Sequence, residues 1–275
     1  MNWFVYAFIC ALSVATADAF SKRALTDNDQ YFVAWVRVLY AVPVMVFVIP
    51  FIDIPELDTV FFVITFVLLP LDIVALLLYL RAIQVSPLSL TLPFLSLTPV
   101  FLIVTSYLML GEVPDKAGFA GILLVATGAY CLNIHVVKQG FLEPFRSIGN
   151  EKGSVLMIMV AFLFSITSNL GKIAVQHSSP IFFSIFYLFL LSFSLSLIVR
   201  FKSKNILSKA VSHPWLFLFM GISMAIMMLT HLKAVSLVEV SYMISVKRLS
   251  LIIGVIYGAL FFKEKNIKER ILGSA

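Results

Sequence analysis

The sequence predicts an all-α membrane protein, a polytopic helical bundle, and three observations lead to this prediction. First, 61% of the 275 residues are hydrophobic and 12% are charged, with a mean hydropathy of +1.04. That leaves too little polar surface for a water-soluble globule. Second, the apolar segments are about twenty residues long, the length that an α-helix needs to cross a bilayer. Third, short polar breaks separate these segments, which do not alternate in polarity as barrel strands do.

Nine spanning helices are expected, and the polar breaks place them at about residues 3–20, 31–51, 59–80, 88–110, 117–134, 153–175, 180–201, 214–234 and 240–262. The first segment lacks the positive flank of a signal peptide and further spans follow it, so we expect it to be retained. The longest connection has mixed charge, two glycines and a proline, as linkers do. We therefore expect a first unit at 1–137, a linker at 138–152 and a second unit at 153–275.

The two expected units repeat one another. At a spacing of 152 residues the sequence matches Arg81 with Lys233, Glu112 with Glu264 and Gly121 with Gly273, and at 150 it matches Lys22 with Lys172. Because the first unit has five helices, an odd number, the second must enter the bilayer from the opposite side. Secondary transporters use such inverted repeats to build one site between two halves. The second unit stops at Ala275, so we expect its fifth helix, the tenth of the bundle, to be truncated from this sequence.

The net charge of +6 does not indicate nucleic-acid binding, because the cations are scattered over the loops. Loops after odd-numbered helices contain Lys22, Arg23, Arg81, Lys138, Arg146, Lys152, Arg200, Lys202, Lys204, Lys209, Lys263, Lys265, Lys268 and Arg270. Loops after even-numbered helices contain Lys116, Lys172 and Lys233, beside Asp53, Glu56 and Asp58. The positive-inside rule places the first set in the cytoplasm and the N-terminus outside.

Several kinds of chemistry lack the residues they need. Cys10 and Cys131 lie inside apolar spans, and neither a CxxC pair nor a cluster of cysteine and histidine suggests a metal. The sequence has no nucleophile elbow, zinc-protease motif, P-loop or dinucleotide loop. We expect no enzymatic activity, no cofactor and no metal.

The repeated motifs carry a family resemblance. They are LYLRAIQVSPLSL at the end of the third helix, the mid-helix proline of LSLTPVFLIV, the Gly-Glu end MLGE and the following helix GFAGILLVATGAYCLNI. With these motifs the chain is similar to the drug/metabolite transporter superfamily, in its ten-helix EamA-like branch. The resemblance covers the chain except the absent tenth helix. It implies two inverted five-helix units and the transport of a small solute, and it says little about which solute.

A second, local resemblance concerns the predicted sixth and ninth helices. The Lys247-Arg248 pair, and Lys172 in SITSNLGKIA, are similar to residues of triose-phosphate and nucleotide-sugar type translocators. In those relatives such residues bind the substrate phosphate, so the resemblance implies an anionic substrate. The second unit departs from the first by placing Leu251 where the first has Pro99. Members of the superfamily usually keep both termini in the cytoplasm, against the loop charges, so the sidedness stays open.

The ninth predicted helix contains the main candidate site. Cations inside a span are costly, so Lys247 and Arg248 need water, an anion or a protein partner. Helical spacing places Ser241, Ser245 and Arg248 on one stripe, where a guanidinium and an ammonium would bind a carboxylate or phosphate. Alternatively, Lys247 extends to an interface and Arg248 pairs with a carboxylate. The matching residues of the first unit are Leu95 and Ser96, so the cation pair is an asymmetric addition.

Other polar residues are expected near the same cavity. Lys172 and Asn169, late in the sixth helix, either complete the anion site or anchor the helix at the interface. Asp18, deep in the first helix, is either a counterion to Lys22 or Lys247, a proton carrier, or a helix-end cap. Arg37 is interpreted as structural, bonding backbone carbonyls.

Aromatic and histidine side chains complete the candidates. His231 either responds to pH or packs as a hydrogen-bonding residue. Tyr79 and Tyr242 either line the cavity, with hydrogen bonds and cation–π contacts, or pack as aromatic core. Gly254 and Gly258, spaced G-x-x-x-G, are expected to allow close helix contact.

We therefore expect a secondary active transporter of a small organic metabolite bearing a carboxylate or phosphate, working by alternating access. Its expected partners are the solute, the lipid bilayer and a coupling proton, with no nucleic acid, and it is expected as a monomer or homodimer in the plasma membrane of a prokaryote. Two alternatives remain open. One is an exporter of amino acids or drugs, with the cations countered by Asp18, and the other is a membrane scaffold that transports nothing.

Overall fold

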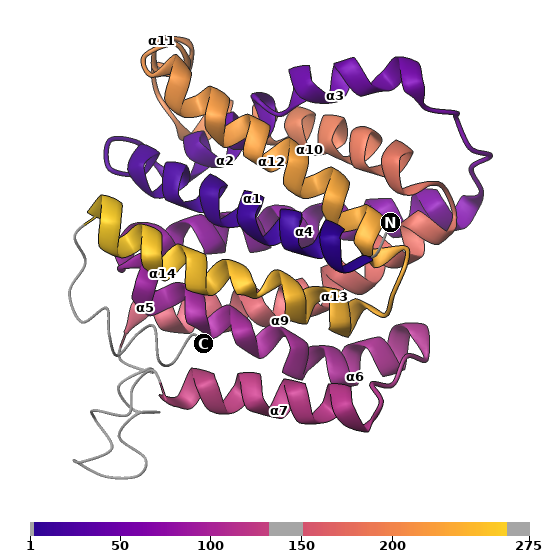
Figure 1. Ribbon diagram of the computed structural model, residues 1–275. Helices are drawn as coiled ribbons and strands as arrows, with labels where there is room; N and C mark the ends of the chain where they lie inside the picture. The colour runs from indigo at the N-terminus through magenta and orange to yellow at the C-terminus, as the bar shows by residue number, and fades with distance from the viewer. Residues whose placement is uncertain (1–2, 132–150, 263–275) are drawn as a thin grey trace.

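The computed structural model describes residues 3–131 and 151–262, and every regular element within them is a helix (Figure 1). Eight segments of the described residues are long and apolar enough to span a membrane: Trp3–Ala24, Gln30–Phe51, Thr59–Val85, Leu88–Leu110, Lys152–Gln176, Pro180–Lys202, Pro214–Val235 and Val240–Phe262. The predicted helix at 117–134 corresponds to α7 (Lys116–Cys131), and its last residues lie outside the described ranges. The predicted all-helical, polytopic membrane fold is confirmed.

Several of these helices begin at a side-chain cap. Asp29 accepts a hydrogen bond from the Phe32 N–H at 2.9 Å and starts α2 (Gln30–Leu39). Asp58 starts α4 (Thr59–Val85) in the same way. Ser179 starts α10 (Pro180–Lys202). Such caps satisfy N–H groups that have no partner inside the helix.

Three predicted helices are broken, and this corrects the expectation of continuous spans. The predicted 31–51 helix divides into α2 and α3 (Val42–Val48), with Pro43 in the first turn of α3. The predicted 88–110 helix divides into α5 (Leu88–Thr91), a 3₁₀ segment (Leu92–Leu97) and α6 (Thr98–Leu110). These two breaks coincide with prolines, which lack an N–H to continue the helical ladder. Conversely α4 continues to Val85, five residues beyond its predicted end at 80, and stops just before Pro87.

The third break has no proline. The predicted 240–262 helix divides into α13 (Val240–Lys247) and α14 (Leu249–Phe262) at Arg248. The Arg248 N–H is shared between the carbonyls of Ile244 and Ser245, both 3.1 Å away. This division falls at the predicted cation pair, and broken spanning helices are typical of transporter binding sites.

The two units run in opposite directions across the bundle. α1 (Trp3–Ala24) ends near Ser86, because Lys22 donates a hydrogen bond to the Ser86 carbonyl at 2.8 Å. The Ser86 hydroxyl in turn contacts Glu151, which caps the beginning of α9 (Lys152–Gln176). The end of α1 and the beginning of α9 therefore lie at the same end of the molecule, as an inverted repeat requires.

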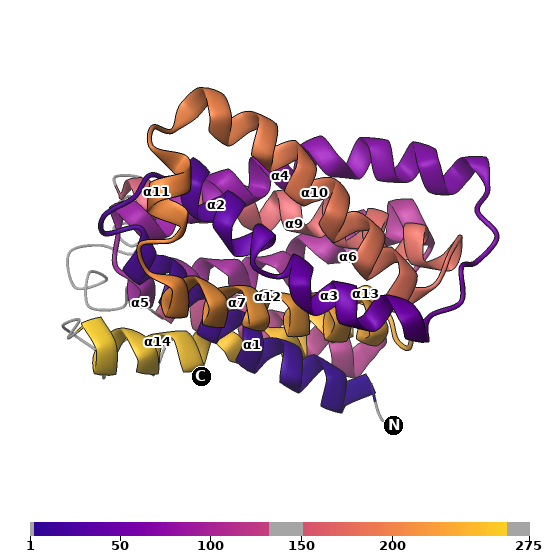
Figure 2. The same ribbon diagram turned by 90° about the horizontal axis from the view of Figure 1, so that it is seen from above.

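We name the two ends of the bundle after the short helices found there. The α11 end contains α11 (Ile206–Ala210) and the beginning of α5 (Figures 1 and 2). The α13 end contains the beginning of α13, the end of α6 and Trp3. The second span of unit two, α10, and its third, α12 (Pro214–Val235), connect these ends.

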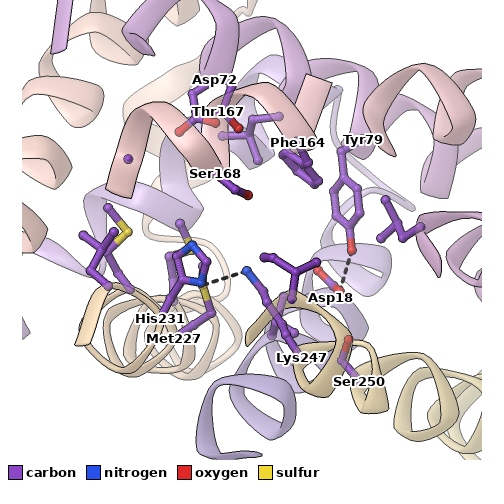
Figure 3. A pocket seen from close by; sticks show the side chains of 18 of the residues that line it. Asp18, Asp72, Tyr79, Phe164, Thr167, Ser168, Met227, His231, Lys247 and Ser250 are labelled. Atoms are coloured by element: carbon purple, nitrogen blue, oxygen red, sulfur yellow. Dashed lines mark hydrogen bonds between the residues drawn. The ribbon is translucent and has the colours of Figure 1, made fainter. Parts of the chain in front are cut away.

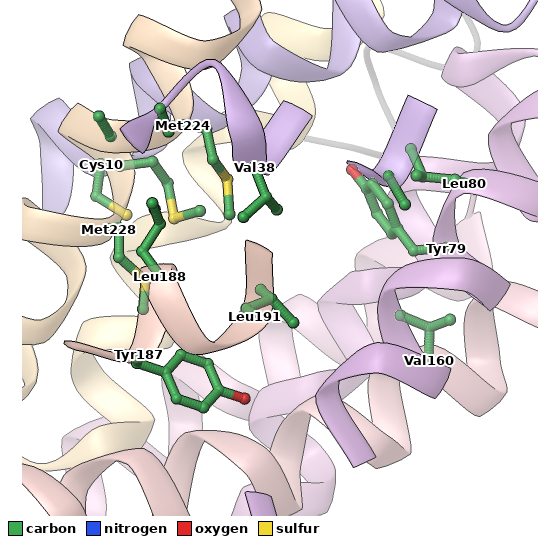
Figure 4. Packing of buried hydrophobic residues seen from close by; sticks show 14 of the residues in the cluster. Cys10, Val38, Tyr79, Leu80, Val160, Tyr187, Leu188, Leu191, Met224 and Met228 are labelled. Atoms are coloured by element: carbon green, nitrogen blue, oxygen red, sulfur yellow. The ribbon is translucent and has the colours of Figure 1, made fainter. Parts of the chain in front are cut away.

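The two units pack closely against each other through helices of both units. The most extensive helix packing joins α1 to α12 and α4 to α9, and both pairs cross between units. One buried apolar core continues through both units, and Figure 4 shows part of it, where Val38 of α2, Leu191 of α10 and Met224 of α12 approach one another. Because helices of one unit pack against helices of the other, residues from the first three spans of each unit surround the centre of the molecule.

Some sequence predictions lie outside the described residues. Glu264 and Gly273, the second members of two repeat matches, belong to this group, as does almost all of the predicted linker at 138–152. The predicted unit boundaries stay predictions, as does the expected loss of a tenth helix.

Candidate functional site

A cavity of about 150 Å³ lies at the centre of the bundle, between the two units (Figure 3). Its wall comes from the first, second, third and fourth spans of both units. Asp72, Thr167 and Ser168 lie on one side of it, and His231 and Lys247 lie on the other. A cavity of this size accommodates a small organic molecule of roughly six to ten non-hydrogen atoms.

The repeat explains how these residues meet. Positions that match at the repeat spacing of 150 to 152 residues line the same cavity from opposite units: Asp18 and Ser168, Arg37 and Tyr187, Asp72 and Met224, Tyr79 and His231, Leu95 and Lys247. The backbone positions are therefore symmetric and the chemistry is not. Both carboxylates come from the first unit, and the histidine and the Lys-Arg pair come from the second.

Asp18 is held in a buried polar network. Its carboxylate pairs with the Arg37 guanidinium, Oδ1 to Nη1 at 2.9 Å, and accepts a hydrogen bond from the Tyr79 hydroxyl at 2.5 Å. Arg37 also donates to the Ser21 hydroxyl at 3.2 Å, and its Nε is buried without a partner. This corrects two expectations: among described residues the salt-bridge partner of Asp18 is Arg37, not Lys22 or Lys247, and Arg37 bonds side chains, not backbone carbonyls.

Asp72 forms the second carboxylate site. It lies midway along α4, and the Tyr187 hydroxyl of α10 donates to its Oδ2 at 3.0 Å. The Thr167 side chain on α9 is a further hydrogen-bonding neighbour. Within the described ranges no lysine or arginine pairs with this carboxyl group, which lines the cavity wall.

Lys247 and Arg248 contribute positive charge on the opposite wall. No carboxylate of the described residues lies within salt-bridge distance of either cation. Among the described residues Lys247 Nζ has only a long contact of 3.9 Å with the sulfur of Met227, and in Figure 3 it points into the cavity. Arg248 is 8% exposed; its Nη2 donates to the Thr98 hydroxyl at 2.6 Å, and its Nε is buried without a partner. Cations that lie inside an apolar span with free hydrogen-bond donors favour an anion.

The rest of the wall is apolar and deformable. It includes Phe164 and three methionines of α12, Met224, Met227 and Met228. Unbranched methionine side chains adapt their shape to a neighbour. The cavity thus combines polar anchors at its two sides with a wall that can adjust to a carbon skeleton.

The structure brings five of the predicted site residues together: Asp18, Tyr79, His231, Lys247 and Arg248. His231 is partly exposed, and its Nδ1 is buried with no hydrogen-bond partner among the described residues. Tyr79 lies near the Arg37 guanidinium, 6.0 Å from the ring centroid.

Four predicted residues lie elsewhere, because other partners hold them. Asn169 is buried against α6, where it accepts from the Ser106 hydroxyl at 2.8 Å. The Tyr242 hydroxyl donates to Asp115 in the α6–α7 connection at 2.7 Å. Ser245 donates to the Ser241 carbonyl within α13, and neither serine lines the cavity.

Lys172 also lies outside the cavity wall. Its ammonium forms a close ion pair with Glu112, just after α6, and donates to the Val238 carbonyl at 2.9 Å. We expected Lys172 to complete the anion site. In the structure its charge is instead paired with Glu112, a carboxylate of the first unit.

Two polar wall residues, Asp72 and Tyr187, were not predicted from the sequence. For Asp72 a signal was present, because a single carboxylate in the apolar run LLPLDIVALL is itself an indication of function. Thr167 lies in the Ser/Asn-rich stretch that drew attention to Lys172. Tyr187 carried no signal, because tyrosines are common in such spans.

In the described ranges no group of three histidine, cysteine or carboxylate side chains is close enough to hold a metal ion. The polar groups of the cavity are dispersed on opposite walls. They suit an extended organic molecule with separate charged or hydrogen-bonding ends.

The eight apolar spans of the described residues, the opposite orientation of the two units and the cavity at the centre of the bundle define a polytopic membrane protein built as secondary transporters are built. Comparison with protein-family models identifies the family: the EamA-like transporter family matches residues 1–134 and 151–275, and the chain belongs to it. No curated protein matches the chain significantly. The match covers both units, and the local resemblance to triose-phosphate type translocators stays a prediction.

Proposed function

We propose that this transporter moves a small organic anion, bearing a carboxylate or a phosphate, through the central cavity by alternating access. The single observation that supports an anion best is the pair Lys247 and Arg248, which lies at a helix break and lacks a carboxylate partner among the described residues. The guanidinium offers a bidentate fork and the ammonium a point charge. Tyr79 and Ser168 would orient the rest of the solute.

Transport would proceed by a rocking movement about the cavity. The interlocked pairs α1 with α12 and α4 with α9 would move as rigid elements, while the broken fourth spans adjust at each end. Coupling would come from obligatory exchange or from a proton. Asp18 and His231 are the proposed proton carriers, because both line the cavity beside the cations. We also propose the plasma membrane of a prokaryote as its location, which membrane fractionation would check.

Thermal stabilisation in detergent tests the anion site. Purified protein is screened against monocarboxylates, dicarboxylates, phosphomonoesters, amino acids and neutral polyols, since a ligand stabilises in proportion to the logarithm of its concentration over Kd. We expect an anion to raise the unfolding temperature. Lys247→Met and Arg248→Gln should each lower the affinity for that anion by about tenfold to a hundredfold, the effect of losing a hydrogen bond to a charged group.

Lys233→Met is the matched control, because Lys233 lies in the last turn of α12 and does not line the cavity. It should retain the anion affinity of the parent. Uptake of the same anion into proteoliposomes should follow the same order of variants. Stabilisation by neutral solutes alone, unaffected by the Lys247 and Arg248 variants, would refute the anion site.

A second candidate substrate is an amino acid, and the observation that favours it is Asp72. A zwitterion would place its carboxylate on Lys247 and Arg248 and its ammonium on Asp72 across the cavity. Asp72→Asn separates the candidates: it should abolish stabilisation by amino acids and leave stabilisation by simple anions unchanged or stronger. The scaffold alternative has lost its support, because the chain belongs to a transporter family.

A further inference from the structure

Polar contacts join the two units at the α13 end of the bundle. Glu112 forms an ion pair with Lys172 through one carboxylate oxygen, and its other oxygen accepts a hydrogen bond from the Val240 N–H at 3.1 Å. Lys172 donates to the Val238 carbonyl as well. We call Glu112 and Lys172 the latch. It ties the end of α6, in the first unit, to the end of α9 and the beginning of α13, in the second.

The C-terminal end of α6 directs the Glu112 side chain toward α13. α6 ends at Gly111 in the left-handed conformation, φ +69°, and the Glu112 N–H turns back to the Ser106 carbonyl at 3.3 Å. This glycine-dependent helix end projects the next residue away from the axis of α6. The carboxylate thereby meets the first N–H groups of α13, where negative charge is favoured.

A neighbouring contact strengthens the attachment of α13. The Tyr242 hydroxyl donates to Asp115, and the Asp115 N–H donates back to the same hydroxyl at 3.1 Å. Gly118 makes room for the ring, because a Cβ there would lie 2.6 Å from Tyr242 atoms. The first two turns of α13 are therefore fastened to the first unit at two places.

α13 leads directly to the substrate cations. It ends at Lys247, seven residues after Val240 and about 10 Å along the helix axis. The chain then breaks at Arg248 before α14 begins. The latch thus sets the direction of a short rigid helix whose other end presents Lys247 to the cavity.

The opposite end of the molecule contains a related contact. Lys22, the repeat match of Lys172, donates to the Ser86 carbonyl at 2.8 Å and to the Ile83 carbonyl at 2.5 Å. Ser86 and Val238 are themselves 152 residues apart. The same lysine-to-carbonyl bond therefore precedes the broken fourth span in each unit, which indicates a device belonging to the repeat and not a chance surface pair.

We propose that Glu112 and Lys172 are positioning residues for transport: their ion pair closes the α13 end of the cavity, and its opening pivots α13 about Arg248 and moves Lys247. This inference rests on the proposed alternating-access function. A solute anion that binds Lys247 and Arg248 would contact the C-terminal end of α13, whereas the latch holds its N-terminal end. Opening of the latch and occupation of the site are thereby linked through α13.

Cysteine labelling tests the latch without needing the solute. Cys10 and Cys131 are replaced by alanine, and a single reporter is introduced as Gly171→Cys, on the cavity wall next to the latch, or as Leu95→Cys, on the wall from the other unit. A Cβ at Gly171 meets nothing nearer than Leu232 at 3.9 Å, so the reporter fits. The rate of reaction with an uncharged, water-soluble maleimide is measured in detergent.

Glu112→Gln and Lys172→Met should each raise the labelling rate of Gly171→Cys at least tenfold, and the rate of Leu95→Cys should rise as well, because both residues line the same cavity. Lys172→Arg retains the cation and should return the rate to near the parent value. Glu151→Gln is the matched control, because Glu151 joins the units at the α11 end through Ser86. It should leave labelling of Gly171→Cys unchanged.

An unchanged rate in both latch variants would overturn the proposal, as would an equal rise in Glu151→Gln, which would indicate general loosening. If Glu112→Gln does not give monodisperse protein, Lys172→Met removes the same ion pair from its other side. Thermal stabilisation by the anion that binds the parent is measured on every variant. Failure of the parent to bind any anion would count against the proposed substrate alone, because the labelling result decides the latch independently.

Discussion

Asp18 and Arg37 form an ion pair in the middle of the bundle, with side-chain exposures of 5% and 3%. A buried pair contributes little net stability over an apolar replacement, but removing one partner leaves the other charge without compensation. Here Tyr79 satisfies the second carboxylate oxygen as well. The pair and the tyrosine thus fix the first three spans of the first unit relative to one another.

Asp18→Asn should therefore lower the free energy of unfolding by about 3 kcal/mol, because the Arg37 guanidinium is left buried without an anion. Tyr79→Phe removes a single hydrogen bond and should cost about 1 kcal/mol. Thermal unfolding of both variants in the same detergent measures the difference. Equal losses would mean that the ion pair is not the dominant interaction at this position.

Glu151 predicts a pH dependence at the membrane surface. Burial alone would raise the pKa of its carboxyl, but hydrogen bonds from Ser154, Ser86 and Gly153 outweigh burial and lower the pKa below its ordinary 4.5. Since the pKa of the folded state is the lower one, this carboxylate stabilises the protein fully above pH 4.5, and the stabilisation is lost as the pH falls below that value.

The thermal midpoint of the parent should therefore decline more steeply between pH 6 and pH 3.5 than that of Glu151→Gln. The two midpoints should approach each other as the pH falls through the lowered pKa and the glutamate becomes protonated. Parallel profiles would show that other carboxyl groups cause the acid sensitivity.

At the scale of helices, close approach depends on a few glycines. An ideal Cβ at Gly221 in α12 would lie 2.4 Å from the backbone carbonyl carbon of Tyr40, at the break between α2 and α3. Backbone atoms cannot move aside as a flexible side chain can. Gly254 in α14 also lies in close contact with a neighbour, because an ideal Cβ there would lie 2.7 Å from the end of the Leu92 side chain. The predicted close contact at Gly254 thus has a structural counterpart within the bundle.

Gly221→Ala should separate α12 from α2 and cost about 2 kcal/mol of stability, as overpacking does. Gly121→Ala in α7 is the matched control, because a Cβ there meets nothing within 4 Å. The control should be neutral or slightly stabilising, since alanine is the better helix former. The thermal midpoints of the two variants show whether close helix packing or helix propensity determines the effect of alanine at Gly221.

At the scale of the whole molecule, charge is distributed unevenly between the two ends. Among described residues the α11 end contains Lys22, Arg23, Arg81, Lys152, Arg200, Lys202, Lys204 and Lys209, and the α13 end contains Lys116, Lys172 and Lys233. Lys172 is also neutralised by Glu112. The positive-inside rule therefore favours a cytoplasmic α11 end.

Single cysteines test this orientation in intact cells. Ile54→Cys lies in the exposed connection at the α13 end, where Ile54 is 81% exposed, and should react with a membrane-impermeant thiol reagent from outside. Ser212→Cys, after α11 at the opposite end, should react only after the cells are opened. The reverse pattern would correspond to the cytoplasmic termini that are usual in the superfamily.

The sequence by itself determined the class of fold and the repeat. Segment length and hydropathy reflect the bilayer directly, because lipid requires every spanning backbone to satisfy its own hydrogen bonds. The motifs repeated at a fixed spacing, such as Arg81 with Lys233, required two related units, and the odd helix number required their inversion. Lys247 and Arg248 were recognisable as candidates because charge inside an apolar span is rare.

Only the tertiary structure decided which polar residues meet. Asp72, Tyr187 and Arg37 belong to three different spans, and their common position follows from the crossed packing of the units, which no local pattern encodes. Lys172 faces Glu112 for the same reason, because the end of α6 and the end of α9 come together only after both units fold. Hydropathy reports the surroundings of each segment along the chain, whereas the partner of a buried charge depends on distances between segments far apart in sequence.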